Sequence, residues 1–335
     1  MQYNNFYINW RYKMNFIDMH CDTIYALINK KPCSNKNIAI SENETLYKNS
    51  LSVDIEKLEA SNSLAQFFAL FIDINETNSP LKTTLNMLDF FHNELAKHSK
   101  YIALAKNYED INKNLSNNKI SAFLTIEEGA ALEGTLYNLR NFYRLGVRLI
   151  TLTWNFPNEI GFPNCKKEFM NKGLTPFGLE VVEEMNKLKM IIDVSHLSDG
   201  GFYDVVRYSK SPFVASHSNA RTITNHPRNL TDDMIKILSN KGGVMGINFE
   251  KTFLGQSEEG KIPEMIDHIK HIKNVGGIDV MCIGSDFDGI ETPSEIKSSD
   301  EIEKLINALK KESFHESEIE KILYENALRV IKEIL

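Results

Sequence analysis

Short apolar runs alternate along the chain with longer amphipathic segments. The runs are rich in Val, Ile, Leu and Phe, and they occupy residues 15–20, 65–74, 120–126, 147–154, 190–196, 212–217, 242–249 and 280–286. Nearly continuous apolar runs of this length are typical of β-strands that are buried on both faces of a parallel sheet. The pattern therefore predicts eight buried strands.

The intervening segments have the period of amphipathic helices, and several open with Asp, Ser or Thr and close on Gly. They cover residues 81–98, 136–146, 178–190, 200–209, 231–243 and 265–277. Eight strand–helix units favour an α/β fold of the closed (β/α)8 TIM-barrel type, with inserted loops and a C-terminal helix over 316–335 that packs under or beside the barrel. An open doubly wound sheet is the weaker alternative, because no G-x-G-x-x-G follows the first strand.

No stretch rich in Pro, Gly or Ser marks a domain boundary. We therefore expect residues 1–335 to form a single domain, with 1–13 as an N-terminal extension ahead of the first strand.

Composition narrows the classes of partner. The chain has 38 Lys and Arg against 45 Asp and Glu, a net charge of −7 that argues against nucleic-acid binding. No apolar stretch is long enough to span a membrane and no secretory signal is visible, so we expect no membrane partner and a cytoplasmic location. The four cysteines are far apart in sequence, as expected of reduced thiols.

Residues that can ligate metals stand at the ends of the predicted strands. In a barrel these ends form one face, where catalytic groups gather. The residues are His20 and Asp22 at the end of the first strand, Glu127 at the end of the third, His196 at the end of the fifth, His217 at the end of the sixth and Asp286 at the end of the eighth. Taken singly, such residues are more often structural; their convergence favours a metal centre. Whether Glu127 or its neighbour Glu128 faces the site stays open at this point, because strand ends are uncertain by a residue or two.

Histidine and carboxylate ligands without thiolate suit Zn²⁺ first, with Mn²⁺, Co²⁺ or Fe²⁺ as alternatives. There are too many ligands for one tetrahedral site, so two ions sharing a carboxylate fit better. A water between the ions would lose a proton and act as a hydroxide nucleophile, and Asp286 would pass that proton to a leaving amine. The predicted reaction is hydrolysis of an amide or a related carbonyl compound.

Motifs along most of the chain carry a family resemblance. They are IDMHCDT (17–23), VDIEKLEASNSLAQFFALFI (53–72), TIEEGAAL (125–132), RLITLTWN (148–155), IIDVSHLSDGGFYDV (191–205), PFVASHSNAR (212–221), HPRNLTDD (226–233), IGSDFDG (283–289) and NALRV (326–330). The chain resembles the membrane (renal) dipeptidase family of zinc-dependent peptidases, within the amidohydrolase-like superfamily.

The resemblance implies two zinc ions per subunit. It assigns His20 and Asp22 to the first ion, Glu127 to a bridge between both, and His196 and His217 to the second. It also assigns the acid/base role to Asp286.

For substrate binding, the resemblance points to Arg228 as the residue that receives the C-terminal carboxylate of a small peptide, and to Trp154 at a position where mammalian members carry a substrate-polarising histidine. Trp154 is thus one departure from the family pattern. A second is Glu128, which follows Glu127 where the family usually has glycine.

The expected function is a zinc dipeptidase that tolerates a D-amino acid at the C-terminal position and forms a homodimer, as the resemblance implies. Two alternatives are carried. A related amidohydrolase acting on N-acyl-D-amino acids would share every metal ligand. A catalytically silent barrel kept as a binding protein is disfavoured, because such a protein has no chemical reason to keep Asp286 beside five ligands.

Overall fold

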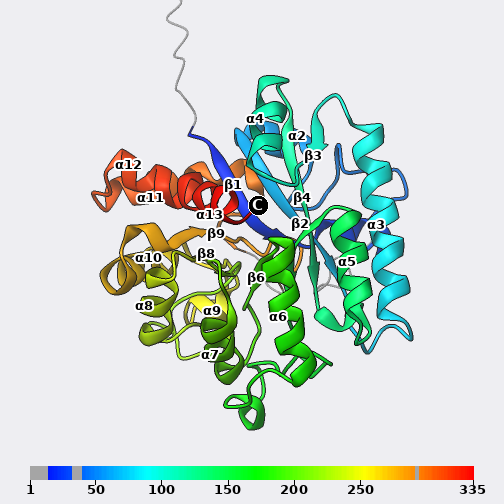
Figure 1. Ribbon diagram of the computed structural model, residues 1–335. Coiled ribbons are helices and arrows are strands. Elements are labelled where there is room, and N and C mark those ends of the chain that lie inside the picture. Colours follow the sequence, from blue (N-terminus) through cyan, green and yellow to red (C-terminus); the bar gives the residue numbers. More distant parts are fainter. Residues whose placement is uncertain (1–13, 32–39, 291–293) are drawn as a thin grey trace, which may run out of the picture.

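The structure is a computed structural model that describes residues 14–31, 40–290 and 294–335. The predicted N-terminal extension, residues 1–13, lies outside this part of the chain. Within it, parallel strands form the centre of the molecule and helices surround them (Figure 1).

The sheet closes into a barrel of eight parallel strands. Around it the order is β2-β1-β9-β8-β7-β6-β5-β4, and β4 returns to β2 through pairs that run from Ala65 with Ser121 to Phe71 with Glu127. A short additional strand, β3, pairs with the beginning of β4. The strands are β1 (Phe16–Cys21), β2 (Ser63–Phe71), β3 (Ile102–Leu104), β4 (Ile120–Glu127), β5 (Val147–Thr151), β6 (Ile191–Asp193), β7 (Val214–Ala215), β8 (Val244–Ile247) and β9 (Met281–Ile283).

Helices follow the strands on the outside of the barrel (Figure 1). They are α1 (Thr23–Asn29), α2 (Ile55–Ala60), α3 (Pro80–Lys97), α4 (Tyr108–Ser116), α5 (Leu136–Arg144), α6 (Pro176–Leu188), α7 (Asp199–Tyr208), α8 (Asp232–Asn240), α9 (Lys251–Leu254), α10 (Ile262–Gly276), α11 (Glu303–Lys311), α12 (Glu316–Glu320) and α13 (Asn326–Ile334). Several begin with a side-chain cap: Ser79, Thr175 and Thr231 each accept a hydrogen bond from a backbone N–H of the first turn.

The (β/α)8 barrel predicted from the sequence is confirmed. Each of the eight apolar runs contains or overlaps one barrel strand, and each of the six amphipathic segments contains most or all of a helix. The sequence pattern missed β3, because three residues are too few to show a period. The predicted C-terminal helix is divided, with a π-helical turn at Lys321–Glu325 between α12 and α13.

The inside of the barrel is filled by one buried cluster. Every barrel strand contributes to it, through residues that include Met19, Phe67, Phe123, Leu149, Ile191, Val214, Val244 and Cys282. The buried face of α13 joins the same cluster with Ala327, Val330, Ile331 and Ile334. Helix α13 therefore closes the barrel interior, and the larger cluster between strands and outer helices forms a second layer of core.

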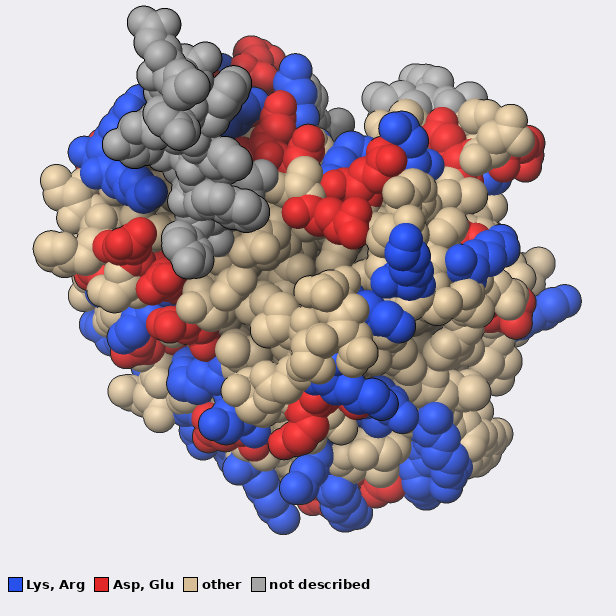
Figure 2. All heavy atoms as spheres, turned by 90° about the horizontal axis from the view of Figure 1, so that it is seen from above, with Lys and Arg blue, Asp and Glu red and all other residues tan. Residues whose placement is uncertain are grey.

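Charges of both signs are mixed over the face drawn in Figure 2, and uncharged side chains occupy much of its middle. No continuous basic surface is visible on that face. Among the described residues, no helix combines the length and the apolar character needed to cross a bilayer.

The packing of α13 generates a stability prediction. Ile331 is fully buried in the interior cluster, so Ile331→Ala should leave a cavity and lower the free energy of unfolding by about 2–5 kcal/mol. Glu333→Ala, on the outer side of the same helix, should change it by less than about 0.5 kcal/mol. Urea denaturation measures both; equal midpoints for the two variants would contradict the closing role of α13.

Candidate metal centre and active-site cavity

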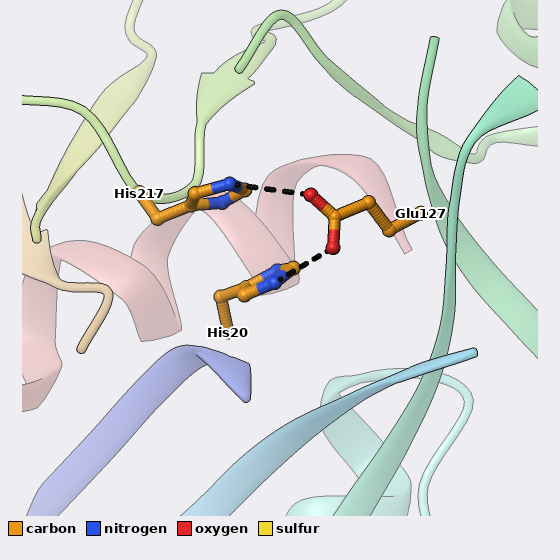
Figure 3. A group of neighbouring side chains, drawn as sticks. All are labelled: His20, Glu127 and His217. Carbon is orange, nitrogen blue, oxygen red and sulfur yellow. Dashed lines mark ion pairs between the residues drawn. The ribbon is translucent and has the colours of Figure 1, made fainter. Parts of the chain in front are cut away.

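All six ligand-type residues predicted from the sequence gather at the C-terminal mouth of the barrel. Three of them are drawn in Figure 3, where His20 from β1 and His217 after β7 point at the carboxylate of Glu127 from β4. The other three, Asp22, His196 and Asp286, follow β1, β6 and β9. Five of the six are buried, and Asp286 is partly exposed.

Glu127 lies at the centre of the group, and its two oxygens face different neighbours. Glu127 Oε2 lies 3.2 Å from His20 Nε2, and His20 Nε2 lies 3.4 Å from Asp22 Oδ2. Glu127 Oε1 lies 3.1 Å from His196 Nε2 and 3.5 Å from His217 Nε2. One carboxylate thus stands between two sets of potential ligands.

Two strands end before the candidate site residues that they were predicted to reach. The runs 190–196 and 280–286 predicted strands that reach His196 and Asp286, whereas β6 ends at Asp193 and β9 at Ile283. His196 (φ 67°) and Asp286 (φ 63°) adopt left-handed backbone conformations, which cannot continue a β-ladder. The turn after each strand, rather than the strand itself, presents the side chain.

Hydrogen bonds from neighbouring groups orient two imidazoles. The Ser216 hydroxyl donates to Asp193 Oδ2 at 2.5 Å and lies 2.7 Å from His217 Nδ1. Because its single proton goes to Asp193, His217 Nδ1–H donates to Ser216 Oγ, which leaves the lone pair of Nε2 free. His196 Nδ1 likewise lies 3.2 Å from Asn155 Oδ1, which can only accept.

The donor set fits divalent cations. The free Nε2 atoms of His196 and His217 lie 3.1 Å apart, too close for two lone pairs unless a cation lies between or beside them. His20 Nδ1 and Nε2 and Asp22 Oδ1 are buried without hydrogen-bond partners. Groups that could hold one ion include His20, Glu127 and His217 together, and His20, Asp22 and Asp286 together.

Burial favours the uncharged form of several of these residues. Desolvation, with repulsion from Glu127, raises the pKa of Asp22 to about 6, and desolvation raises the pKa of Asp286 to about 8. Desolvation also lowers the pKa of His196 to about 3 and that of His217 well below its usual value. The imidazoles of His196 and His217 are therefore neutral, as ligands must be, and Asp22 and Asp286 hold their protons more tightly than exposed carboxylates do. Burial alone would also raise the pKa of Glu127, but the charge of His20 and hydrogen bonds from the histidines hold it well below its usual range.

Asp286 and Arg228 lie beside this centre. Asn248 donates to Asp286 Oδ2 at 2.8 Å, and Asp286 Oδ1 lies 3.8 Å from His20 Nε2. Arg228 is buried; its Nη2 donates to the His217 carbonyl at 3.1 Å and its Nη1 to Ser218 Oγ at 3.3 Å, while Nε has no partner. A buried guanidinium with a free donor is suited to an anionic ligand.

A cavity of about 480 Å³ opens over the candidate ligands. Its walls include Asp22, Glu127, His196, Asp286, Arg228 and Trp154, together with Tyr25, Phe71, Asp73, Glu76, Asn155, Cys165, His226, Glu250, Thr252, Phe253, Gly289 and Ile290. The structure thus brings all eight residues singled out in the sequence to one site, His20 and His217 lying just beneath the cavity floor in contact with Glu127.

Several residues of this site were not found from the sequence. Ser216 and Asn155 orient the candidate ligands His217 and His196 by hydrogen bonds, and Asn248 holds Asp286. Asp193 acts one step further out, because it accepts the hydroxyl proton of Ser216. Their only sequence signal is adjacency to a strand-end residue, as for Ser216 before His217, and that signal is too common to be specific. His268, which lies in the predicted helical segment 265–277, is fully buried outside this site. Ala220 N donates to its Nδ1 and its Nε2 lies 3.0 Å from the Leu254 carbonyl, so both ring nitrogens make structural hydrogen bonds.

Sequence comparison relates the chain to known peptidases. A model of the membrane dipeptidase family (peptidase family M19) matches residues 10–335. An uncharacterized protein in the pqqA 5′ region of Klebsiella pneumoniae is 32% identical over 265 residues, 76% of this chain and 97% of that protein. An uncharacterized dipeptidase of Schizosaccharomyces pombe is 31% identical over 337 residues, 94% of this chain and 79% of that protein.

Solved structures show the same fold. The crystal structure of a dipeptidase, a metallo peptidase of family M19, has a TM-score of 0.83 at 25% identity and covers 96% of this chain and 99% of its own. A metallo peptidase from Rhodobacter sphaeroides, solved with a phosphinate mimic of the dipeptide L-Ala-D-Ala, has a TM-score of 0.84 at 23% identity and covers 96% of this chain and 100% of its own.

The geometry predicts how the centre responds to metal. Adding Zn²⁺ to chelator-treated protein should raise Tm, because an ion that binds only the folded state stabilises it. Ser216→Ala should weaken zinc affinity by about 10–100-fold, because it removes the partner that orients His217. Scanning calorimetry measures the change in Tm and calorimetric titration measures the zinc affinity, with Ser209→Ala, whose hydroxyl donates to the Ser211 carbonyl, as the matched control. Equal affinity for the two serine variants would contradict the orienting role of Ser216.

Proposed function

The chain belongs to the membrane dipeptidase family, peptidase family M19, and from this premise we propose that it hydrolyses dipeptides with two zinc ions held at the barrel mouth. Membership makes it a metal-dependent dipeptidase. The identity of the metal, the number of ions and the role of each residue are the content of the proposal.

The observation that carries the proposal is the position of Glu127. Its Oε2 faces His20 and its Oε1 faces His196 and His217, which is the arrangement of a carboxylate that bridges two cations. We assign His20 and Asp22 to one ion, His196 and His217 to the other, and Glu127 to both. Other divalent transition metals with a preference for nitrogen and oxygen could replace zinc.

When bound, two such ions would supply a hydroxide from water and polarise the scissile carbonyl. The protein's own residues supply the rest. Asp286, held by Asn248, accepts the proton of the attacking water and returns it to the leaving amine. Arg228, whose side chain lines the cavity, binds the C-terminal carboxylate through its guanidinium, and Trp154 forms part of the wall against which the substrate packs.

The finer points follow from the family resemblance: tolerance of a D-residue at the C-terminal position and assembly as a homodimer. A cytoplasmic location would keep Cys21, Cys165 and Cys282, which are free thiols, in the reduced state. Size-exclusion chromatography with light scattering tests the dimer.

A matched substrate panel tests the function. With zinc-loaded protein, we expect amine release from L-Ala-L-Ala and L-Ala-D-Ala, and its loss on adding chelator. L-Ala-D-Ala is included because the Rhodobacter protein was solved with a mimic of it. Cleavage of N-acetyl-D-Ala alone would move the function to the N-acyl-D-amino acid alternative. Silence on all three substrates, with metal bound, would favour a binding protein.

The role of Asp286 gives a sharper prediction. Asp286→Asn should keep both metal ions and lower kcat by about 10²–10⁴-fold, because the amide cannot accept the proton. The control is Asp279→Asn, on the 3-10 turn that leads into β9 rather than at the mouth after it. Unaltered turnover in Asp286→Asn, with metal content measured alongside, would remove this residue from the mechanism.

A further inference from the structure

Glu128 follows Glu127 directly but does not join the candidate ligands. Its backbone has φ 94°, a left-handed conformation that is rare for a residue with a side chain, and the side chain is completely buried. Its Oε1 accepts a hydrogen bond from Ala130 N at 2.9 Å, and its Oε2 accepts one from Trp154 N at 3.0 Å. A third donor is the side-chain amide of Asn158.

Asn158 extends this network through the segment after β5. Its Nδ2 also donates to the Leu152 carbonyl at 2.9 Å, and its Oδ1 accepts from Ile160 N at 2.8 Å and Gly161 N at 3.0 Å. The backbones also meet, since a Cβ placed on Gly129 would lie 2.6 Å from Leu152 O. One buried carboxylate therefore joins the turn after β4 to residues 152–161.

Residues 154 and 155 of that segment face the cavity. The Trp154 ring packs edge-on against Phe71, with 4.8 Å between ring centres, and lies 6.4 Å from the ring of His196. Asn155 Oδ1 is the acceptor for His196 Nδ1. The position of this segment thus decides both the shape of one cavity wall and the orientation of one candidate ligand.

We propose that Glu128 is a positioning residue, which holds the segment carrying Trp154 and Asn155 in place over the active site. Glu128 acts on the substrate through Trp154 and on the metal centre through Asn155. Its own side chain contacts neither the substrate nor the metal ions. The kinetic part of this proposal rests on the proposed dipeptidase function; the structural part does not.

The test uses Trp154 as its own reporter. The chain has two tryptophans, Trp10 and Trp154, so in a Trp10→Phe background the fluorescence comes from Trp154 alone. Glu128→Gln has one acceptor oxygen instead of two, and the orientation that keeps the Ala130 and Asn158 bonds turns an NH₂ group toward Trp154 N. We expect Trp154 to become more accessible to acrylamide quenching, and KM to rise about tenfold with a smaller change in kcat.

Two further variants complete the experiment. Asn158→Ala breaks the same network from the loop side without changing β4, and it should reproduce the quenching and the rise in KM, so the test survives if Glu128→Gln does not fold. Glu133→Gln, an exposed glutamate that follows the same short turn, should leave both unchanged. Unaltered quenching in both Glu128→Gln and Asn158→Ala would overturn the proposal. If the wild type releases no amine, the dipeptidase assignment fails while the quenching result still decides the role of Glu128.

Discussion

Three carboxylates crowd around one buried imidazole at the mouth of the barrel, and this concentration of negative charge governs the site. Asp22, Glu127 and Asp286 lie within a few ångströms of the same imidazole, that of His20. Burial raises the pKa of Asp22 and of Asp286, because the interior gives little solvation to a negative charge. Divalent cations held there would supply the missing positive charge. On the proposed assignment, the carboxylate of Glu127 would serve both ions.

The surrounding structure stabilises the buried charged and polar groups of the site. The barrel interior beneath it is apolar and closed by α13, and the polar groups of the site lie at the C-terminal mouth. Around the candidate ligands, whose atoms His20 Nδ1, His20 Nε2 and Asp22 Oδ1 have no hydrogen-bond partner, the supporting polar groups are hydrogen-bonded. Asp193 is fully buried, yet it accepts from Thr151 Oγ1, Ser195 N and both polar groups of Ser216. That network in turn sets the ring of His217, so the packing of the core and the geometry of the site are not independent.

On the proposed function, specificity would lie in the loops. The candidate ligands lie at strand ends or in the turns directly after them, whereas Arg228, Trp154 and Asn155 belong to longer segments between strands and helices. Such segments can change without disturbing the barrel, which explains how the same ligands can serve different substrates. In this chain a second buried glutamate, Glu128, ties one of these loops to the strand that carries Glu127.

The sequence by itself determined the barrel and the position of most ligands along it. Both depend on local properties: a buried strand has an apolar run, and the residue at the end of the run must lie at the barrel mouth, as His20, Glu127 and His217 do. The resemblance to a family then assigned roles that residue patterns left open, including the choice of Glu127 over Glu128.

Only the tertiary structure decided how these groups face one another. Strands β6 and β9 end before His196 and Asp286. Left-handed backbone conformations at these two residues then turn their side chains into the site. The hydrogen bonds that support the site join segments far apart in the sequence. Ser216, the neighbour of His217, bonds to Asp193, and Trp154 bonds to Glu128. Hydrogen bonds between distant segments leave no periodic trace in a sequence, since each depends on where two loops meet in space.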